Sequence, residues 1–560
     1  MIRKWHPRRA GVVAVACAFL CVPCLAGQNN ANAKAEGGVF RVAGVVVSAK
    51  TGEALAQARV MLVSTTNPRD MASMVTEEGG RFAFAGLSAG KYSLEGARRG
   101  YIGAAYQQHE QYSTAIVTRA GLDTENLMLR LVPMAALNGA VIDENGEGVR
   151  DAQVRLYGES HRGGTTRVIL LRSEGTDDQG TFEFAPLGPG KYYVSASASP
   201  WYAMRSPTSA AINGGTSVGN VDRSLDMVYP TTFYGGATDS AGAEAIEVQA
   251  GNHQHIEVHL SPVADLHVIL NVGGDGRQGY RVPEFRARTF GVMEPAQLNG
   301  IQSWQSSSAP LVIELAGLAP GQYSVRMPEN GAGDFTQETA VDLKQNGQDL
   351  SETEGDPLAS VKIAVKMPKG ESLPKQTALG LQDEQNRTVA WSQVDQDGVA
   401  KFPGLSAGKY SVRVFGEGAA YAVTHMASAE AELAAPEFDL RSGESQKWTV
   451  EVAAAKTTIE GFVKREGKIA SGVMVVLIPN RPEAHMDLFR RDQSDLDGSF
   501  VLRDVIPGSY SVVAIEDAWG FDWSQPTLLA RYAQRGQAVT VSELMHGAVS
   551  LLDPVQVQPK

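Results

Sequence analysis

A six-residue pattern occurs five times in this chain: Leu or Val, two residues, Gly, one residue, and Tyr. Its tyrosines are Tyr92, Tyr192, Tyr323, Tyr410 and Tyr510, and they lie 100, 131, 87 and 100 residues apart. That spacing matches whole domains rather than the 20–50 residues of a solenoid repeat. The chain is therefore expected to be a string of similar domains.

The residues before each tyrosine indicate strands and a hairpin turn. In the first copy an acidic turn ends at Gly80 and is followed by Phe82 and Phe84, which face the same side of a strand. The repeat tyrosine then points inward on the next strand, where its hydroxyl needs a partner. It resembles the corner-pinning tyrosine of β-sandwiches. We assign this structural role to Tyr92, Tyr192, Tyr323, Tyr410 and Tyr510.

The start of each unit alternates apolar and polar residues around a Gly turn, as in residues 42–62. No stretch beyond the N-terminus combines helical periodicity with caps over twelve or more residues. The sequence therefore predicts an all-β protein with one sandwich in each unit.

Four short motifs together resemble a known family. In the first unit they are Gly44-x-Val46, Gly52-x-x-Leu55-x-x-Ala58-x-Val60, Glu77-x-x-Gly80-x-Phe82 and Gly86-Leu87-x-x-Gly90-x-Tyr92. This set resembles the carboxypeptidase regulatory-like domain. The resemblance implies a tandem array of about five immunoglobulin-like or transthyretin-like β-sandwich domains, a fold group that includes carbohydrate-binding modules. The domain accompanies carboxypeptidases and is not itself the protease.

The resemblance and the repeat divide the chain into six segments. These are a signal peptide (1–26), sandwich 1 (37–133), sandwich 2 (134–262) with a long loop (204–226), a degenerate sandwich 3 (263–350), sandwich 4 (356–452) and sandwich 5 (455–560). Short linkers between the units predict a semi-rigid rod.

The N-terminus is typical of a secretory signal. Four basic residues precede a 13-residue apolar run, Ala10 to Val22, which is too short for a comfortable membrane span. Cleavage after Ala26 would leave 534 residues without cysteine and with a net charge of −16 in place of −12. Such a chain is expected to be exported to the periplasm, the cell surface or the medium. Its charge argues against nucleic acid as a partner, and no integral membrane segment is expected after signal removal.

One strand carries three histidines. His253, His255 and His259 share a face with Glu257, and alternating histidines on a strand can bind zinc. Because the intervening residues are apolar and supply the core face, we expect these histidines to face solvent, with a metal site as the less favoured alternative.

Two motifs suggest catalysis or nucleotide binding but lack their structural context. Gly215-x-Ser217-x-Gly219 has no following helix, and the glycine pattern at residues 274–279 precedes Tyr280-Arg-Val-Pro rather than a helix. The His-Glu-x-x-His motif of metalloproteases is absent. We expect no enzyme activity and no cofactor.

Large aromatic residues give the best indication of ligand binding. Trp201 and Trp519 each lie nine residues after a repeat tyrosine, near Tyr202, Phe521 and Trp523. Sugars stack on exposed aromatic faces, although an aromatic residue recurring at this position is also expected to cap the sandwich edge. We therefore expect an exported, non-enzymatic protein that binds polysaccharide or another cell-surface component. A protein–protein scaffold or spacer at the cell envelope is the alternative, and an accessory protein of a hydrolase is less favoured.

Overall fold

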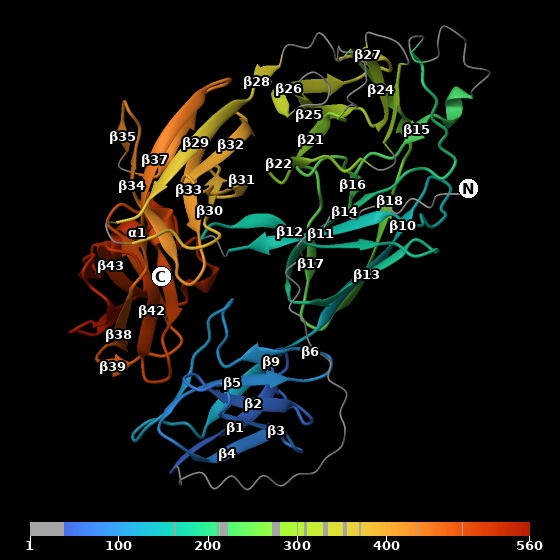
Figure 1. Cartoon of the computed structure of the whole chain (residues 1–560). Helices are drawn as coiled ribbons and strands as arrows, with labels where there is room; N and C mark the ends of the chain where they lie inside the picture. Colours follow the sequence, from blue (N-terminus) through green and yellow to red (C-terminus); the bar gives the residue numbers. More distant parts are fainter. Residues whose placement is uncertain are drawn as a thin grey trace, which may run out of the picture.

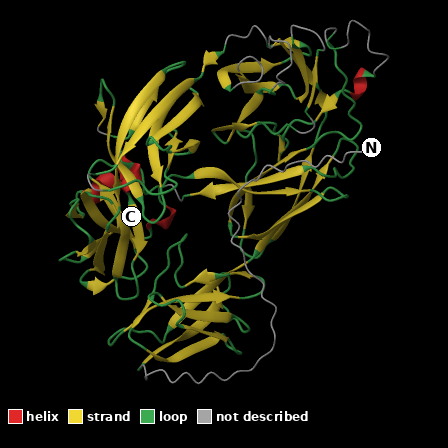
Figure 2. Ribbon diagram, in the orientation of Figure 1, coloured by secondary structure: helices red, strands yellow, loops and turns green. Residues whose placement is uncertain are grey.

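The computed structural model describes residues 39–161, 164–209, 212, 222–271, 281–298, 301–306, 311–328, 334–350, 355–368, 371–433, 435–483 and 485–560. Strands dominate these residues, and Pro526–Ala533 (α1) is the single α-helix among them (Figure 2). The prediction of an all-β array of sandwiches is confirmed. The expected signal peptide, residues 1–26, lies outside the described residues.

The first two sandwiches each contain two main sheets. Sandwich 1 has the orders β4 (Arg81–Leu87), β1 (Phe40–Ser48), β9 (Leu127–Pro133), β6 (Tyr101–Ile102) and β3 (Met71–Val75), β2 (Arg59–Ser64), β5 (Gly90–Ala97), β7 (Ala104–Ala105), with β8 (Ile116–Thr118) on β5. Sandwich 2 has β13 (Thr181–Leu187), β10 (Ala135–Ile142), β18 (His253–His259) and β12 (Arg167–Gly175), β11 (Gln153–Ser160), β14 (Gly190–Ser197), β16 (Thr232–Phe233), with β17 (Ile246–Val248) on β14. A small pair, β15 (Met227–Val228) with β19 (Val263–Ala264), leads to the next unit.

The third and fourth sandwiches follow the same plan. Sandwich 3 has β23 (Gln302–Gln305), β24 (Val312–Leu318), β20 (Leu266–Asn271), β27 (Gln348–Asp349) and β22 (Val292–Pro295), β21 (Glu284–Thr289), β25 (Gly321–Pro328), β26 (Phe335–Leu343), β28 (Asp356–Pro357). Sandwich 4 has β32 (Val399–Leu405), β29 (Ala359–Lys366), β37 (Ser445–Ala454), β34 (Tyr421–Ala427), β35 (Glu432–Leu433) and β31 (Thr388–Gln393), β30 (Ala378–Gln382), β33 (Gly408–Phe415), β36 (Glu437–Leu440).

In sandwich 5 the two layers join into one continuous sheet. Its order is β39 (Lys468–Ile469), β38 (Thr457–Arg465), β46 (Val555–Gln558), β43 (Gly508–Ile515), β40 (Met474–Pro479), β41 (Arg490–Gln493), with β42 (Ser499–Val505) and β45 (Gly547–Ser550) on β38 and β44 (Gln537–Val541) on β43. Short 3-10 helices are Arg223–Leu225 (η1), Met486–Leu488 (η3) and Ala518–Gly520 (η4).

All five sandwiches begin with the same strand pairing. The first strand pairs antiparallel with the strand that leads to the repeat tyrosine, and the register shifts once near its start. The other edge of that first strand pairs parallel with a late strand of the same unit. Sandwich 3 therefore shares the topology of the others, although its sequence carries few of the family motifs.

The repeat tyrosine lies where the chain crosses from one layer of the sandwich to the other. In every unit its hydroxyl donates a hydrogen bond to the carbonyl oxygen four residues earlier. The acceptors are Ser88 (3.2 Å), Gly188 (2.9 Å), Ala319 (3.0 Å), Ser406 (2.7 Å) and Ile506 (2.7 Å). Burial raises the pKa of Tyr323 and Tyr410 to about 12, so both phenols stay protonated as donors.

The five sandwiches close on themselves (Figure 1), because sandwich 5 packs against sandwich 1. Lys91 Nζ lies 2.6 Å from Asp495 Oδ2, and Arg491 Nη2 lies 2.8 Å from Glu110 Oε2. The backbone joins as well, since Leu496 N donates to Ala115 O at 3.0 Å. The expected semi-rigid rod is therefore wrong, because polar residues nearly 400 positions apart in the sequence bond to each other and bring the ends of the array together.

Replacing Tyr192 with Phe is expected to lower the free energy of unfolding by about 1 kcal/mol, because a largely buried hydrogen bond is lost. Tyr193→Phe is the matched control, since its hydroxyl forms no hydrogen bond among the described residues and its ring is only partly buried. Thermal unfolding of both variants measures the difference. Equal melting temperatures for the two variants would contradict the structural role.

Replacing Arg491 with Met is expected to open the closed array, because Glu110 would be left partly buried without its cation. Small-angle X-ray scattering should then show a larger radius of gyration than for the unaltered chain. Arg130→Met, at an exposed position of β9, is the control and should leave the radius unchanged. An unchanged radius for Arg491→Met would show that the other contacts suffice to hold sandwiches 1 and 5 together.

Candidate functional site

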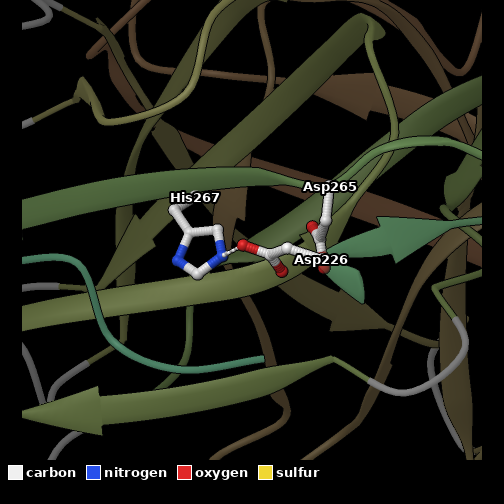
Figure 3. Close-up of side chains that lie close together, drawn as sticks. All are labelled: Asp226, Asp265 and His267. Atoms are coloured by element: carbon white, nitrogen blue, oxygen red, sulfur yellow. Dashed lines mark hydrogen bonds and ion pairs between the residues drawn. The ribbon is translucent and has the colours of Figure 1, made fainter. Parts of the chain in front are cut away.

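A histidine held between two carboxylates lies at the junction of sandwiches 2 and 3. His267 on β20 has no exposed surface. Its Nδ1 lies 2.7 Å from Glu314 Oε1 on β24, and its Nε2 lies 2.8 Å from Asp226 Oδ2, which follows η1 in the long loop of sandwich 2. Figure 3 shows the imidazole edge directed at the Asp226 carboxylate. Sequence analysis missed this group, although a histidine and a glutamate within apolar strands signal buried partners.

The same junction contains a second ion pair. The Arg205 guanidinium Nε bonds to Asp265 Oδ2, and both side chains are almost fully buried. Asp265 Oδ1 also accepts hydrogen bonds from the backbone N–H groups of Gly317 (2.7 Å) and Leu318 (2.9 Å). Asp265 therefore connects the loop of sandwich 2 to the end of β24.

Glu314 fixes the start of the long loop. Its carboxylate accepts hydrogen bonds from the backbone N–H of Thr208 at 2.6 Å and of Ser209 at 2.7 Å, and from the Thr208 hydroxyl at 2.8 Å. The same carboxylate also accepts from His267, so the negative charge of Glu314 holds both the loop and the imidazole. Burial disfavours the imidazolium, but the bonds to Asp226 and Glu314 outweigh burial and raise the pKa of His267 to about 9. His267 is therefore a cation at neutral pH.

Asp226, Asp265 and His267 are close enough to be considered as metal ligands. However, both ring nitrogens of His267 are bonded to carboxylates, and both oxygens of Asp265 accept hydrogen bonds. Of the candidate ligand atoms on these three residues, Asp226 Oδ1 is buried and has no hydrogen-bond partner among the described residues. A single free oxygen is too few for a metal centre, so the arrangement fits an ion-pair network better than a metal site.

A cavity of about 1180 Å³ lies where sandwiches 2, 3 and 4 meet. Its wall includes Thr165–Ile169 and Val228–Pro230 from sandwich 2, Phe290–Val292 and Ala319–Tyr323 from sandwich 3, and Glu384, Gln385 and Arg387 from sandwich 4. The charged junction supports this wall, because Asp265 binds Gly317 and Arg205 donates to the Met227 carbonyl at 3.1 Å.

Two arginines give the cavity polar donors. Arg387 Nη2 lies 2.5 Å from Asp383 Oδ2, whereas Arg387 Nε and Nη1 are buried without a hydrogen-bond partner among the described residues. Desolvation lowers the pKa of Arg167, and although Asp383 opposes that shift, the nearby Arg387 charge adds to it. The two guanidinium groups are therefore close enough to repel each other, and Arg387 retains donors for another acceptor.

Phe290 anchors sandwich 3 on sandwich 2 beside this cavity. It occupies the turn between β21 and β22, and its ring centroid lies 5.1 Å from Tyr157, 5.0 Å from Tyr193 and 5.7 Å from Phe233. Its backbone N–H donates to Ser240 Oγ at 2.7 Å. This aromatic cluster fixes the separation of two cavity walls.

The aromatic residues of sandwich 5 do not form an exposed surface. Trp519 stacks on His109 of sandwich 1, with ring centroids 4.8 Å apart. Phe521 packs edge-on against Tyr532 of α1. The guanidinium carbon of Arg491 lies 4.1 Å from the ring centroid of Trp523. Phe521 and Trp523 are each only 8% exposed. The expectation of an open ligand surface at Trp519, Phe521 and Trp523 is wrong, because α1, β41 and sandwich 1 cover these rings.

Trp201 and Tyr202 lie in a different environment. Trp201 is 84% exposed and stands edge-on to Tyr202, with ring centroids 5.7 Å apart. Glu144 accepts hydrogen bonds from the hydroxyls of Tyr202 (2.6 Å) and Tyr229 (2.7 Å). Burial, together with the bond to Glu144, raises the pKa of Tyr202 to about 12. Glu144 thus fixes Tyr202, and the Trp201 indole beside it is largely exposed.

The histidines of β18 are all exposed. His255 Nδ1 lies 3.1 Å from Asn138 Oδ1, and His259 Nε2 lies 3.1 Å from Glu257 Oε2. The structure therefore places His253, His255 and His259 on the outward face of β18, opposite to its apolar residues. Ser217 and the glycine pattern at 274–279 lie outside the described residues.

Comparison with known proteins identifies the class of the first unit. Residues 41–121 match the carboxypeptidase regulatory-like domain, so the family expected from the sequence motifs is confirmed there. No protein of curated function matches the chain.

Similar solved structures include a Bacillus anthracis protein and two streptococcal pilins. The Bacillus anthracis TIE protein is 14% identical over 76% of this chain and 76% of its own, with a TM-score of 0.17. A streptococcal ancillary pilin is 11% identical over 56% of this chain and 98% of its own (TM-score 0.20). GBS52, the minor pilin of Streptococcus agalactiae, is 11% identical over 40% of this chain and 96% of its own (TM-score 0.19). At these TM-scores the likeness says nothing about a ligand.

The ion-pair network is expected to make stability depend on pH. The pKa of His267 is raised above its ordinary value, so its contribution is complete below about pH 6.5 and is lost as the pH rises through about 9. Thermal unfolding between pH 6 and pH 10 should show this loss. In His267→Gln the chain should be less stable at pH 7 and the loss between pH 7 and 9.5 should be smaller. An unchanged profile would contradict a charged His267.

Proposed function

We propose that this chain is an exported, non-enzymatic multidomain protein that binds carbohydrate or another cell-surface component, with its ligand site in the cavity between sandwiches 2, 3 and 4. The observation that supports this most directly is Arg387, whose Nε and Nη1 are buried at the cavity without a partner among the described residues. Small-molecule sites typically occupy a few hundred to about 1000 Å³ between domains, with a few polar groups on a largely apolar wall. This cavity has that character.

The absence of enzyme activity is part of the proposal. His267 is the described histidine held most closely by carboxylates, and it has no exposed surface on which a substrate could be placed. General acid–base catalysis requires a group within hydrogen-bond reach of the substrate. Export is supported by the charged and apolar N-terminal sequence. None of the helices in the described part of the chain is long and apolar enough to cross a membrane.

Trp201 and Tyr202 are proposed as a secondary contact for sugar. Trp201 offers an open indole face, and Glu144 fixes its neighbour Tyr202. A saccharide ring that lies on this face would gain apolar contact without any rearrangement of the protein.

A protein–protein scaffold is the second candidate function, and β12 favours it. This strand forms the edge of its sheet, and Ile169, Leu170 and Leu171 are 41%, 45% and 44% exposed. An exposed apolar edge strand can pair with an extended segment of another protein.

The test is a glycan array probed with the mature chain, residues 27–560, followed by titration of any glycan that binds. Arg387→Gln is expected to weaken binding about tenfold or more, because a desolvated charged donor is lost. Ala241→Trp, which places a large ring at the cavity wall, should abolish binding. Arg130→Gln, at an exposed position of β9, is the matched control and should bind normally.

Thermal unfolding must show that the variants remain folded. Binding that survives both cavity changes and is lost in Trp201→Ala would move the ligand site to Trp201. An array without any glycan bound, combined with capture of a protein through β12, would favour the scaffold.

A further inference from the structure

Three lysines stand side by side on the outward face of sandwich 4. Lys362 on β29 pairs directly with Lys401 on β32 at one edge and with Lys447 on β37 at the other. All three side chains are exposed, and Lys366 lies on the same face of β29. Directly opposed residues have Cβ atoms about 5 Å apart, and like charges in such pairs destabilise a sheet. The fold therefore gains nothing from this arrangement.

The equivalent positions in other sandwiches show that lysine is not required by the fold. Sandwich 2 has Asn138 between Glu183 and His255, sandwich 3 has Ile269 between Glu314 and Asp349, and sandwich 5 has Glu460 between Val501 and Ser550. Sandwich 1 pairs Ala43 with Ala83. Among these pairings, sandwich 4 is the case in which the first-strand residue and both of its partners carry a positive charge. Four of the 17 lysines of the chain lie on this one face.

The lysines form few ion pairs. Lys401 Nζ lies 2.8 Å from Asp395 Oδ2, whereas Lys362, Lys366 and Lys447 form no salt bridge with any residue that the structure describes. The acidic groups nearby are Glu451, which pairs with Lys366 across the strands, and Glu432, which lies 3.6 Å from His425. Lys362 and Lys447 are thus exposed, adjacent and uncompensated.

The face is also hollowed. A depression of about 570 Å³ runs over β29, β37 and β34. Its wall includes Lys362, Lys366, Lys447, His425, Ser428 and Thr449, and one carboxylate, Glu451, which pairs with Lys366 across the strands. It lies on the sheet that does not contain the turn at residues 383–387, so it is separate from the cavity between sandwiches 2, 3 and 4. A shallow depression with charged and hydroxyl side chains suits an extended polar chain better than a compact apolar ligand.

We propose that this lysine face binds an acidic polysaccharide, one that carries carboxylates on its sugar rings, laid across strands β32, β29 and β37. Adjacent strands are about 4.8 Å apart, so the ammonium groups can meet negative charges that repeat along a polymer. Charge complementarity is the basis of this choice. The whole chain is acidic, yet charges more than about 8 Å away are largely screened at physiological salt, and the local lysines decide the contact.

The test uses the mature chain with oligomers of polygalacturonate and with the same oligomers methyl-esterified, which removes the charge and keeps the sugar. Calorimetric titration should show that the acidic oligomer binds and the esterified oligomer does not. The affinity for the acidic oligomer should be lower at high salt than at low salt. The double variant Lys362→Gln/Lys447→Gln should bind about tenfold less tightly, a change of ~1.4 kcal/mol. Lys375→Gln/Lys409→Gln, in the same sandwich and away from the depression, is the charge-matched control.

Stability separates a binding role from a structural one. Removing Lys362 and Lys447 should leave the melting temperature unchanged or raise it, because like-charge repulsion is relieved. Arg387→Gln should retain binding of the acidic oligomer, which separates this surface from the proposed cavity site. Equal binding of the esterified oligomer, equal loss in the control variant, or equally tight binding of polyphosphate with the same dependence on Lys362 and Lys447 would each overturn the proposal.

Discussion

The bond from the repeat tyrosine to the carbonyl four residues earlier is the constraint on which each sandwich depends. The strand before this turn belongs to one layer of the sandwich and the strand after it to the other, so the turn sets how the two layers face each other. Without the bond a largely buried phenol would lack a partner, which costs more than the bond itself contributes. Five units that differ elsewhere keep this one bond because the relation between their sheets requires it.

The contacts between sandwiches follow a different principle. Each unit buries its own apolar core, and the junctions combine a few aromatic contacts, such as Phe290 and Trp519, with buried polar groups. The polar groups are His267 with its two carboxylates, Arg205 with Asp265, and Arg491 with Glu110. Buried ion pairs of this kind contribute little net stability compared with apolar packing, but they tolerate few alternative arrangements. They therefore fix how the units are oriented, and through Asp265 they also fix one wall of the large cavity.

The sequence was sufficient for the parts of the structure that local chemistry determines. The spacing of Gly and Tyr predicted the sandwiches, since a turn residue and a partly buried phenol act within about ten residues. It was insufficient for Trp523, whose exposure depends on Arg491 and α1, and for Trp519, which stacks on a histidine 410 residues away. An aromatic residue after a strand is equally compatible with a ligand surface and with an interface, and a partner that distant leaves no periodic signal.

His267 shows what could have been read from the sequence and was not. It interrupts an apolar strand, Leu266 to Leu270, and Glu314 interrupts another. A charge inside an apolar strand must be paired or neutral. Those two residues therefore predict each other, but not Asp226, which comes from a loop of the preceding unit.

The outward faces of the sheets are where the five units are free to differ. Core and turn positions must satisfy packing and hydrogen bonding, so they recur as apolar residues, Gly and Tyr. The position of Lys362 points away from the core in the same register in every sandwich, and the others hold Ala43, Asn138, Ile269 or Glu460 there. Lys362 is exposed, whereas Ala43 is buried and the other three are partly buried. A substitution there changes the charge of a face without touching the core. One scaffold can therefore present chemically different surfaces or junctions from unit to unit, which is the physical advantage of an array over a single large domain.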